Sequence, residues 1–379
     1  MTQEAFAADM LSDVLDLEDR AQDCFQQGRY QDAIAAAEAA LARDPNALTA
    51  RLIRDLAHKA LALSRQVFLA EPSLQPGAPV VLMLSSTGPG NVPHDHLLPL
   101  TRFGRIFWFL ENDLPKDEGE IPAHDIVFNV VGDIDAAPGA HALALRFAKS
   151  SRRPVLNLPD RVDRTSRAGM AALLAGCPNM CIPGVARIAR GEDPQASGLN
   201  YPLIVRPAGK HGGEGAVLVE GAEQFAAQLP DAPLLYATEF VDYRSPDGWY
   251  RKYRVIFVDR KPYPYHLAIG PHWLVHHWTT GMEKDAGRRA EEMRFLMDPV
   301  QAIGETLWAS LHEIGTRLDL DFGGIDFSVL GDGRLLFFEA NATMLVHPEE
   351  DQMFAYKNFA VQAITDAFGR MIARAIARA

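Results

Sequence analysis

This sequence has few cysteines, and its basic residues are outnumbered by acidic ones. Its 379 residues include only three cysteines, Cys24, Cys177 and Cys181, which are too few for a disulfide framework and suit a reducing compartment. With no second thiol pair near Cys177 and Cys181, a zinc site is not expected. The 37 basic and 49 acidic residues give a formal net charge of -12, so we expect no nucleic-acid partner and no attachment to an anionic membrane.

Long hydrophobic runs and hydrolase motifs are missing as well. No stretch approaches the roughly 18 consecutive apolar residues of a transmembrane helix. The acidic residues 1–20 show no basic segment followed by an apolar run, as a signal peptide would. We therefore expect a cytoplasmic location. No Gly-x-Ser-x-Gly motif and no evident serine or cysteine nucleophile occurs, which argues against a hydrolase.

The N-terminal part is predicted to be helical. From Asp13 to Ala70, apolar residues recur at helical spacing, and residues 28–46 resemble one tetratricopeptide repeat whose second helix ends at Asp44-Pro45. A single repeat cannot bury its own face, so it should stack on a further helix at residues 48–69 or on another subunit. A docking module for a protein partner and a helical cap on the rest of the chain are both open.

A small α/β domain is predicted next. Residues 71–79 contain three prolines and a glycine, which indicates a boundary. Short apolar runs then alternate with helical or turn-rich segments, a pattern typical of a parallel sheet. The expected strands are Val80–Leu84, Ile106–Leu110, Ile126–Val131 and Val155–Leu158.

The strongest chemical signal is a predicted β-hairpin at residues 322–341. Asp332-Gly333 favours a two-residue turn because this dipeptide accepts positive φ angles. In that register Asp326 lies directly opposite Glu339, where like charges destabilise a sheet. Something positive should therefore lie between them. Since side chains alternate along a strand, Asn341 projects on the same face as Glu339.

Two carboxylates and an amide oxygen suit a hard cation. Magnesium commonly takes one or two carboxylates and completes its octahedron with water and phosphate oxygens. We therefore predict that Asp326, Glu339 and Asn341 hold Mg²⁺, or Mn²⁺, as the protein half of a metal-ATP site. Protonation of one carboxylate is the competing explanation.

A glycine-rich loop upstream is predicted to bind phosphate. A strand runs into Arg206, and four glycines follow within residues 209–215. Such a loop folds closely over an anion and presents backbone N–H groups, while Arg206 and Lys210 add positive charge. The loop lacks the Gly-Lys-Ser/Thr ending of a P-loop. The predicted nucleotide-binding residues here are Arg206, Lys210, His211, Gly212, Gly213, Glu214 and Gly215.

The order of these features resembles the ATP-grasp superfamily. A charged strand precedes the glycine-rich loop, a strand then ends at Glu239, a basic strand carries Arg254, and the hairpin with the two acids comes last. The similarity is closest to glutathione synthetase and the RimK-like amino-acid ligases, and it covers roughly Leu156 to the C-terminus. The resemblance implies an α/β (α+β) fold in which an ATP-grasp part follows a small parallel α/β domain and an N-terminal helical segment.

The resemblance also implies domain boundaries and residue roles. The expected parts are a helical segment at 1–76, a pre-ATP-grasp domain at 78–157, an N-terminal lobe at 158–235 and a C-terminal lobe at 236–379. In the family, the residue at Arg206 contacts the α- and β-phosphates and is usually lysine. Glu239 is the candidate for holding adenine and ribose, with an exposed strand-end acid as the alternative. Arg254 is expected to bind a substrate carboxylate or to stabilise the transferring phosphate.

Two segments depart from the family pattern. Residues 342–345, Ala-Thr-Met-Leu, stand where relatives typically have a serine or proline and a glycine, so the acceptor end of the site should differ in shape. Residues 272–278 are rich in histidine and tryptophan. A substrate pocket or packed loop and a metal-binding cluster are the alternatives for this segment.

The implied activity is ligation of a carboxylate to an amine through an acyl phosphate, with release of ADP and phosphate. ATP and magnesium are the implied cofactors, and the substrates would be small carboxylates and amines such as amino acids or a peptide. A small-molecule kinase, a catalytically silent ATP-binding regulatory protein and a scaffold built on the N-terminal helices are the alternatives. Those helices are also where a second copy of the chain or a protein partner is expected to bind.

Overall fold

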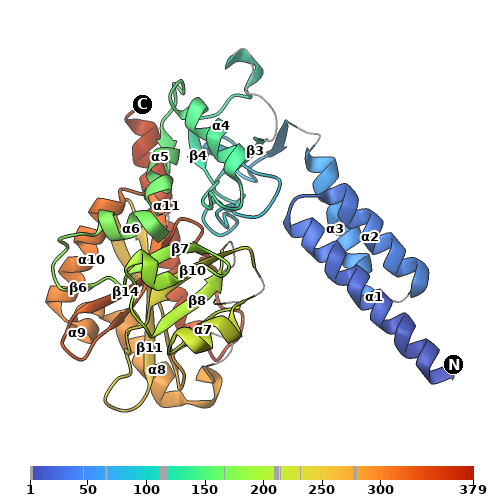
Figure 1. Cartoon of the computed structure of the whole chain (residues 1–379). Helices are drawn as coiled ribbons and strands as arrows, with labels where there is room; N and C mark the ends of the chain where they lie inside the picture. The colour runs from blue at the N-terminus through green and yellow to red at the C-terminus, as the bar shows by residue number, and fades with distance from the viewer. Residues whose placement is uncertain are drawn as a thin grey trace. The chain divides into compact units, whose positions relative to one another are not determined.

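The computed structural model describes residues 3–45, 47–64, 67–110, 118–165, 167–208, 213, 215–230, 232–275 and 280–379. The chain divides into two compact units, the first of residues 1–91 and 99–155 and the second of residues 92–98 and 156–379 (Figure 1). The predicted α/β fold with N-terminal helices is confirmed. The predicted division into four domains stays a prediction. None of the helices among these residues is long and apolar enough to cross a membrane.

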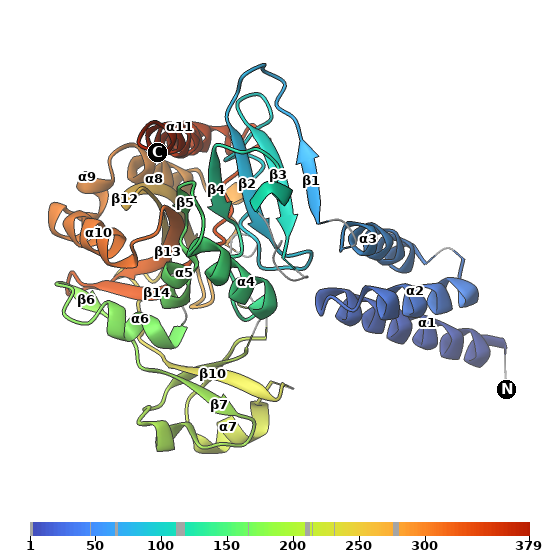
Figure 2. The ribbon, with the colours of Figure 1, turned by 90° about the horizontal axis from the view of Figure 1, so that it is seen from above.

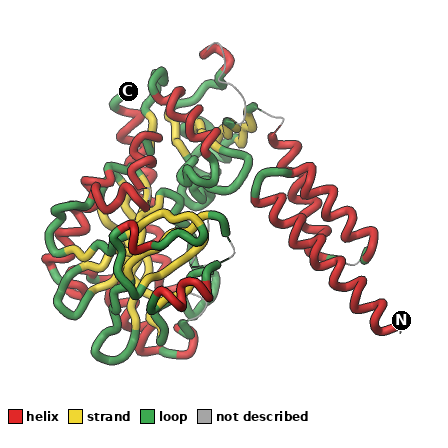
Figure 3. The backbone as a smooth tube through the Cα atoms, in the orientation of Figure 1, coloured by secondary structure: helices red, strands yellow, loops and turns green. Residues whose placement is uncertain are grey.

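The first unit begins with helices α1 (Gln3–Gln26), α2 (Tyr30–Arg43) and α3 (Leu48–Ser64), and Figure 3 shows no strand before β1 among the described residues. Alanines without exposed surface, including Ala33, Ala37 and Ala50, let the helices pack closely. Tyr30 donates a hydrogen bond to the carbonyl of Thr87 at 2.8 Å, which ties α2 to the rest of this unit. The tetratricopeptide assignment and the docking role of these helices stay predictions.

The predicted third helix ends before Leu69. Residues Phe68–Glu71 form strand β1, which pairs antiparallel with β3 (Gly104–Phe109). The Phe68 and Trp108 rings lie 5.5 Å apart, and large apolar side chains of this kind favour a strand over continuation of the alanine-rich helix. The prediction of a helix through Leu69 was therefore wrong at its end, because pairing with β3 outweighs the helical periodicity.

The four predicted strands of the small domain are present in one sheet. Its order is β1-β3-β2-β4-β5, and β2 (Val80–Ser85) pairs in parallel with both β3 and β4 (Ile126–Asn129). Helix α4 (Pro138–Ala148) contributes Ala140, Ala144 and Phe147 to the core of this sheet. The last strand, β5 (Val155–Leu156), is short.

The second unit contains two sheets. The first is antiparallel, with the order β7 (Val185–Ala189), β10 (Leu234–Glu239), β8 (Leu203–Pro207) and β9 (Val217–Val219). The second has the order β12 (Lys261–Gly270), β11 (Tyr250–Val258), β13 (Phe322–Val329), β14 (Leu335–Asn341) and β6 (Met180–Cys181). Figure 2 shows them as separate layers, with α7 (Ala222–Gln228) in the layer of β7 and β10.

Helices cover one face of the sheet that contains β13. Alternate residues of β11, Tyr253, Val255 and Phe257, join a core cluster with side chains of five helices. The intervening Lys252 and Arg254 line a cavity instead. The strand thus separates an apolar face from a charged one. Besides α7, the α-helices of this unit among the described residues are α5 (Pro159–Val162), α6 (Arg167–Leu173), α8 (Ala286–Met297), α9 (Pro299–Ile303), α10 (Glu305–Leu318) and α11 (Asn358–Ala377).

The β13–β14 hairpin has a different turn from the one predicted, yet the same two acids face each other. The Leu330 N–H donates to the Arg334 carbonyl, and the Leu330 carbonyl accepts from the N–H of Gly333, which has φ +83°. The loop therefore has three residues rather than two. This loop shifts the ladder by one residue, but a β-bulge at Phe338 shifts it back. Asp326 therefore lies directly opposite Glu339, as predicted.

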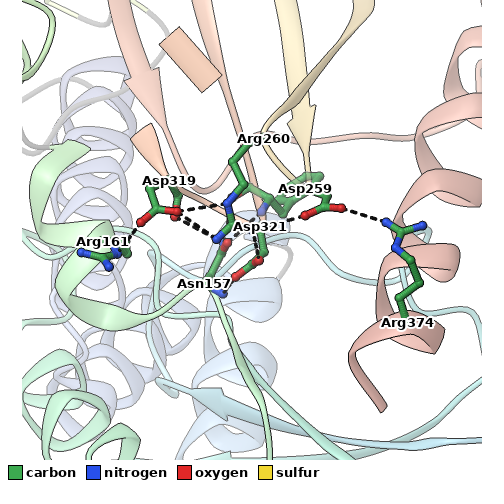
Figure 4. Close-up of polar contacts among 8 residues, drawn as sticks. Asn157, Arg161, Asp259, Arg260, Asp319, Asp321 and Arg374 are labelled. Carbon is green, nitrogen blue, oxygen red and sulfur yellow. Dashed lines mark hydrogen bonds and ion pairs between the residues drawn. The ribbon is translucent and has the colours of Figure 1, made fainter. Parts of the chain in front are cut away.

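Polar side chains hold the start of β13 in place. Arg260, in the turn between β11 and β12, donates to Asp321 at 2.6 Å, and Asp321 also accepts from the backbone N–H of Asn157 at 2.7 Å. The Asn157 side chain exchanges two hydrogen bonds with the backbone of Phe322, each 2.8 Å long. Burial raises the pKa of Asp321, although Arg260 acts against this rise. Neighbouring ion pairs join Arg260 and Arg161 to Asp319, and Arg374 to Asp259 (Figure 4).

The contact between α10 and this turn predicts a strong effect of one glycine. A Cβ at Gly315 would overlap the Arg260 carbonyl oxygen and would lie 2.8 Å from the Phe257 ring. We expect Gly315→Ala to lower the free energy of unfolding by about 1 to 3 kcal/mol, because overpacking outweighs alanine's helix propensity. Urea unfolding measures this difference.

Gly331→Ala is the matched control in the same unit. A Cβ added at Gly331 would meet no heavy atom within 4 Å, and the residue has no positive φ, so its substitution should change the stability by less than about 0.5 kcal/mol. Equal stability of the Gly315→Ala and wild-type proteins would contradict the close packing of α10 on the turn.

Candidate active site

A cavity of about 640 Å³ lies within the second unit. Strands β8 and β10 of one sheet and β11 to β14 of the other line it, together with residues between β14 and α11. Most of the described residues predicted for the site meet here. Those lining the cavity are Arg206, Gly213, Glu239, Arg254, Asp326, Glu339 and Asn341.

The rest of the predicted loop is placed differently. Gly215 is described but does not line the cavity, and the predicted Lys210, His211, Gly212 and Glu214 lie outside the described residues. Gly213 has φ +81°, and a Cβ there would lie 2.8 Å from the Leu274 side chain. Only glycine fits this backbone easily.

Four polar side chains stand side by side across neighbouring strands in the cavity. In the strand ladder Glu339 lies opposite Asp326, Asp326 opposite Arg254, and Arg254 opposite His266. All four residues line the cavity. We refer to Glu339, Asp326, Arg254 and His266 as the charged row. Directly opposed residues on one face of a sheet lie close enough to interact.

Two β-bulges flank the charged row. One lies at Phe338 in β14, and the other lies at Tyr265 in β12, where the register shifts between Arg254 and Val255. In a regular strand consecutive side chains point to opposite faces. Here Phe338 and Glu339 both line the cavity, and so do Tyr265 and His266. The bulges thus direct Glu339 and His266, the two ends of the charged row, toward the cavity.

Asp326 is the most deeply buried charge of the row, with 3% of its side chain exposed. Arg254 donates to both of its oxygens, from Nε at 2.7 Å and from Nη2 at 2.9 Å. Lys252 Nζ lies 3.4 Å from Oδ2. Burial alone would raise the pKa of Asp326, but Arg254 and Lys252 hold it well below its usual value. Asp326 is therefore ionised at neutral pH.

The positive charge expected near Asp326 and Glu339 is thus supplied in this structure by protein side chains. Besides the two cations on Asp326, Arg206 Nη2 lies 3.9 Å from Glu339 Oε2. Arg206 Nη2 is buried and makes no hydrogen bond within the described residues. A buried guanidinium nitrogen without such a bond is costly unless an anionic ligand completes it.

The three predicted metal ligands line the cavity and are of the chemical type that magnesium takes. Two carboxylates oppose each other and Asn341 lies on their face, which is the oxygen donor set that magnesium takes. Among the described residues, no three histidine, cysteine or carboxylate side chains gather as a complete metal cage. Asn341 Oδ1 accepts from the N–H and the hydroxyl of Thr343, both at 2.6 Å. A cation would also compete with Arg254 for Asp326.

Glu239 is anchored by backbone groups. Its carboxylate accepts from the N–H of Asn200 at 2.9 Å and from the N–H of Gly184 at 3.2 Å. The Asn200 backbone bond is the largest of the influences that lower the pKa of Glu239. The carboxylate thus fixes two loops at the edge of the cavity, and its contact with a nucleotide stays a prediction.

Part of the histidine- and tryptophan-rich segment lines the cavity. Trp273, Leu274 and Val275 belong to its walls. The Trp273 carbonyl accepts a hydrogen bond from Tyr243, and the Trp273 ring lies 6.0 Å from that of Phe240. These contacts favour the pocket alternative for the described part. His276, His277 and Trp278 lie outside the described residues.

Several cavity residues were missed in the sequence. Lys252 could have been found, because it lies two residues before Arg254 on the same face of one strand. His266 could not, because its place in the row depends on the bulge at Tyr265. Lys357 is 4% exposed and its Nζ lies 2.5 Å from Glu349 Oε1. Glu349 lies in irregular structure after β14 and Lys357 in a short 3-10 helix before α11, so no strand spacing rule applies to them.

A buried glutamate behind the row was also missed. Glu292 of α8 has no exposed surface. It accepts hydrogen bonds from His266 Nδ1, from the backbone N–H of Leu267 at 3.1 Å and from Tyr356 at 2.6 Å. Burial alone would raise the pKa of Glu292, but its partners, His266 foremost, hold it at about 2. The carboxylate is therefore ionised.

Comparisons with known proteins give similarity in structure only. No protein-family model and no curated protein matches the chain. Among solved structures, D-alanine–D-alanine ligase from Bacillus anthracis is similar with a TM-score of 0.49 and 10% identity, over 80% of this chain and 99% of that chain. D-alanyl-alanine synthetase A from Vibrio cholerae is similar with a TM-score of 0.49 and 12% identity, over 80% and 99%. A RimK domain ATP-grasp protein from Sphaerobacter thermophilus has a TM-score of 0.44 and 13% identity, over 76% and 97%. At such values the function has to be argued from the residues of the cavity.

The pairing of Arg254 with Asp326 predicts a large coupling in stability. Arg254→Gln leaves the buried carboxylate with Lys252 alone, so we expect the free energy of unfolding to fall by about 3 to 5 kcal/mol. Adding Asp326→Asn should restore most of this loss, since it removes the uncompensated charge. A double-mutant cycle measured by urea unfolding gives the coupling.

An exposed ion pair of the same type serves as the control. Arg334 and Asp332 pair at 2.7 Å with half of each side chain exposed, so Arg334→Gln should cost less than about 1 kcal/mol. Additive effects of the Arg254 and Asp326 substitutions would contradict the ionised, paired state of Asp326.

Proposed function

We propose that this protein is an ATP-dependent ligase that joins a carboxylate to an amine. The observation that carries the proposal is the cavity in which the opposed Glu339 and Asp326 lie with Arg254, Lys252 and Arg206. Oxygen donors for a cation and guanidinium groups for anions lie together, as transfer of a phosphoryl group requires. The resemblance of the sequence motifs to the ATP-grasp family supports the same conclusion.

Arg206 and the glycine-rich loop are proposed to bind the phosphates of ATP. The Arg206 nitrogen that makes no hydrogen bond within the described residues would donate to a phosphate oxygen. Gly213, which lines the cavity with a positive φ, lets the loop backbone approach closely. Glu239, at the end of β10, is proposed to face the adenosine part.

Asp326, Glu339 and Asn341 are the residues proposed to hold magnesium. When bound, the ion would neutralise charge on the phosphates during transfer. Arg254 is then the residue placed to pair with the substrate carboxylate or with the transferred phosphoryl group, because it already binds a carboxylate in a two-point geometry. Phe240, Trp273 and Phe338 add apolar surface to the walls of the cavity.

Phosphoryl transfer to the carboxylate gives an acyl phosphate, and this step can be trapped. Hydroxylamine is unprotonated at neutral pH and converts acyl phosphates to hydroxamates without help. The purified protein, incubated with magnesium-ATP, hydroxylamine and pooled amino acids and small dicarboxylic acids, is expected to release ADP and phosphate and to form a hydroxamate. Mass spectrometry of the product then names the carboxylate.

The alternatives give different outcomes in this assay. A small-molecule kinase would yield a phosphorylated product that hydroxylamine does not intercept, and a silent regulatory protein would bind ATP without carboxylate-stimulated phosphate release. Either result would replace the ligase proposal.

The proposed metal site predicts the effect of one conservative substitution. Glu339→Gln removes a charge that faces Asp326 while keeping the shape of the side chain, so we expect the fold to persist and magnesium-dependent phosphate release to fall by at least about 100-fold. Asp332→Asn, at the exposed tip of the same hairpin, is the control and should keep wild-type activity. Unchanged ATP turnover in Glu339→Gln would refute the metal assignment.

A further inference from the structure

The charged row does not end at the residues needed for phosphoryl transfer. From Glu339 and Asp326 it continues through Arg254 to His266, which lies opposite Arg254 on β12 and lines the same cavity. If the metal and the phosphates occupy the end with the two acids, as proposed above, His266 lies one strand beyond the residue that binds the carboxylate. An amine that approached a carboxylate held by Arg254 from this side would meet His266.

Glu292 fixes the protonation pattern of the His266 ring. An ionised carboxylate can only accept hydrogen bonds. Because Glu292 is ionised and contacts Nδ1, Nδ1 must carry the hydrogen, and in the neutral ring Nε2 carries the lone pair. Burial lowers the pKa of His266, with Arg254 and Lys357 acting in the same direction and Glu292 opposing them. The ring is therefore a neutral base at neutral pH.

Several contacts hold the His266 ring and its partner Glu292 in place. Glu292 also accepts from the N–H of Leu267, the residue next to His266, so one carboxylate holds both the ring and its backbone. Tyr356 binds the other carboxylate oxygen at 2.6 Å, and Lys357 lies 3.9 Å from the first. A buried acid that orients a histidine at a cavity wall is the arrangement that catalytic histidines use as general bases.

We propose that His266, oriented by Glu292, is the general base for the acceptor amine. The inference rests on the proposed ligase function and extends it to the second half of the reaction. His266 is the catalytic residue of this step, whereas Glu292 acts through it and is a positioning residue.

The neutral amine attacks the acyl carbon of the acyl phosphate, a C–N bond forms and the nitrogen becomes positively charged. Its proton passes to Nε2 of His266, and the C–O bond to the phosphate breaks, so that inorganic phosphate leaves with the electron pair. The amide and an imidazolium result, and the imidazolium returns its proton to solvent before the next turnover.

Hydroxylamine separates this step from the first one. His266→Asn retains a side-chain N–H donor for Glu292 and removes Nε2. With the carboxylate identified by trapping and pooled amino acids as acceptors, we expect amide formation to fall by about 100-fold or more. Hydroxamate formation by the same variant should stay within about twofold of wild type, because it needs the acyl phosphate but no base. His312→Gln, on the exposed side of α10, is the control for both readouts.

The outcomes separate the two proposals. Equal losses of amide and hydroxamate in His266→Asn would show that His266 supports the fold or the first step, and unchanged amide formation would show that it is not the base. A wild-type protein that forms no hydroxamate would overturn the ligase function and this role with it.

The pH profile tests the positioning role of Glu292. Since Glu292 is the group that raises the pKa of His266 against burial, Arg254 and Lys357, Glu292→Gln should move the acidic limb of the amide-forming rate to lower pH. The hydroxamate profile should not move. An unshifted acidic limb with a uniformly lower rate would mean that Glu292 only stabilises the fold.

Discussion

Removing a carboxylate from water costs several kcal/mol unless cations face it, and the second unit is built around this requirement at Asp326. The strand order places β13 between β11 and β14, so Asp326 has Arg254 and Lys252 on one side and Glu339 on the other. The opposite face of the same strands packs on helices. This packing holds the opposed charges in one arrangement, which a ligand meets when it enters the cavity.

The charged row divides the cavity into two chemical regions. At the Glu339 end, oxygen donors and Arg206 suit a cation and phosphates. At the His266 end, the ring and the buried Glu292 suit the transfer of a proton. Arg254 lies between them and binds a carboxylate at both oxygens. A carboxylate held at this position would be within reach of both regions, which is the geometry that two successive steps on one carbonyl group require.

The sequence predicted the central pair of this site although its prediction of the turn was wrong. Asp332-Gly333 indicated a two-residue turn, whereas the loop has three residues, and the bulge at Phe338 restores the opposition of Asp326 and Glu339. A bulge depends on packing across the whole sheet, so no local pattern announces it. The strands that carry Arg206, Glu239, Arg254, Asp326 and Glu339 followed from local signals and from the family resemblance. His266 and Glu292 did not, because one depends on a second bulge and the other comes from a helix remote in sequence.

The balance of acidic and basic side chains in the cavity gives a reason for a cation to enter together with the nucleotide. The described lining residues include four basic side chains, Arg206, Lys252, Arg254 and Lys357, and four acidic ones, Glu239, Asp326, Glu339 and Glu349. Most of the basic groups are already paired with acids, as Lys357 is with Glu349 and Arg254 is with Asp326. These residues therefore offer no surplus of positive charge to a triphosphate. A nucleotide that enters with a divalent cation meets the acids as ligands instead of as repelling charges, and it leaves Arg254 to exchange one carboxylate for another.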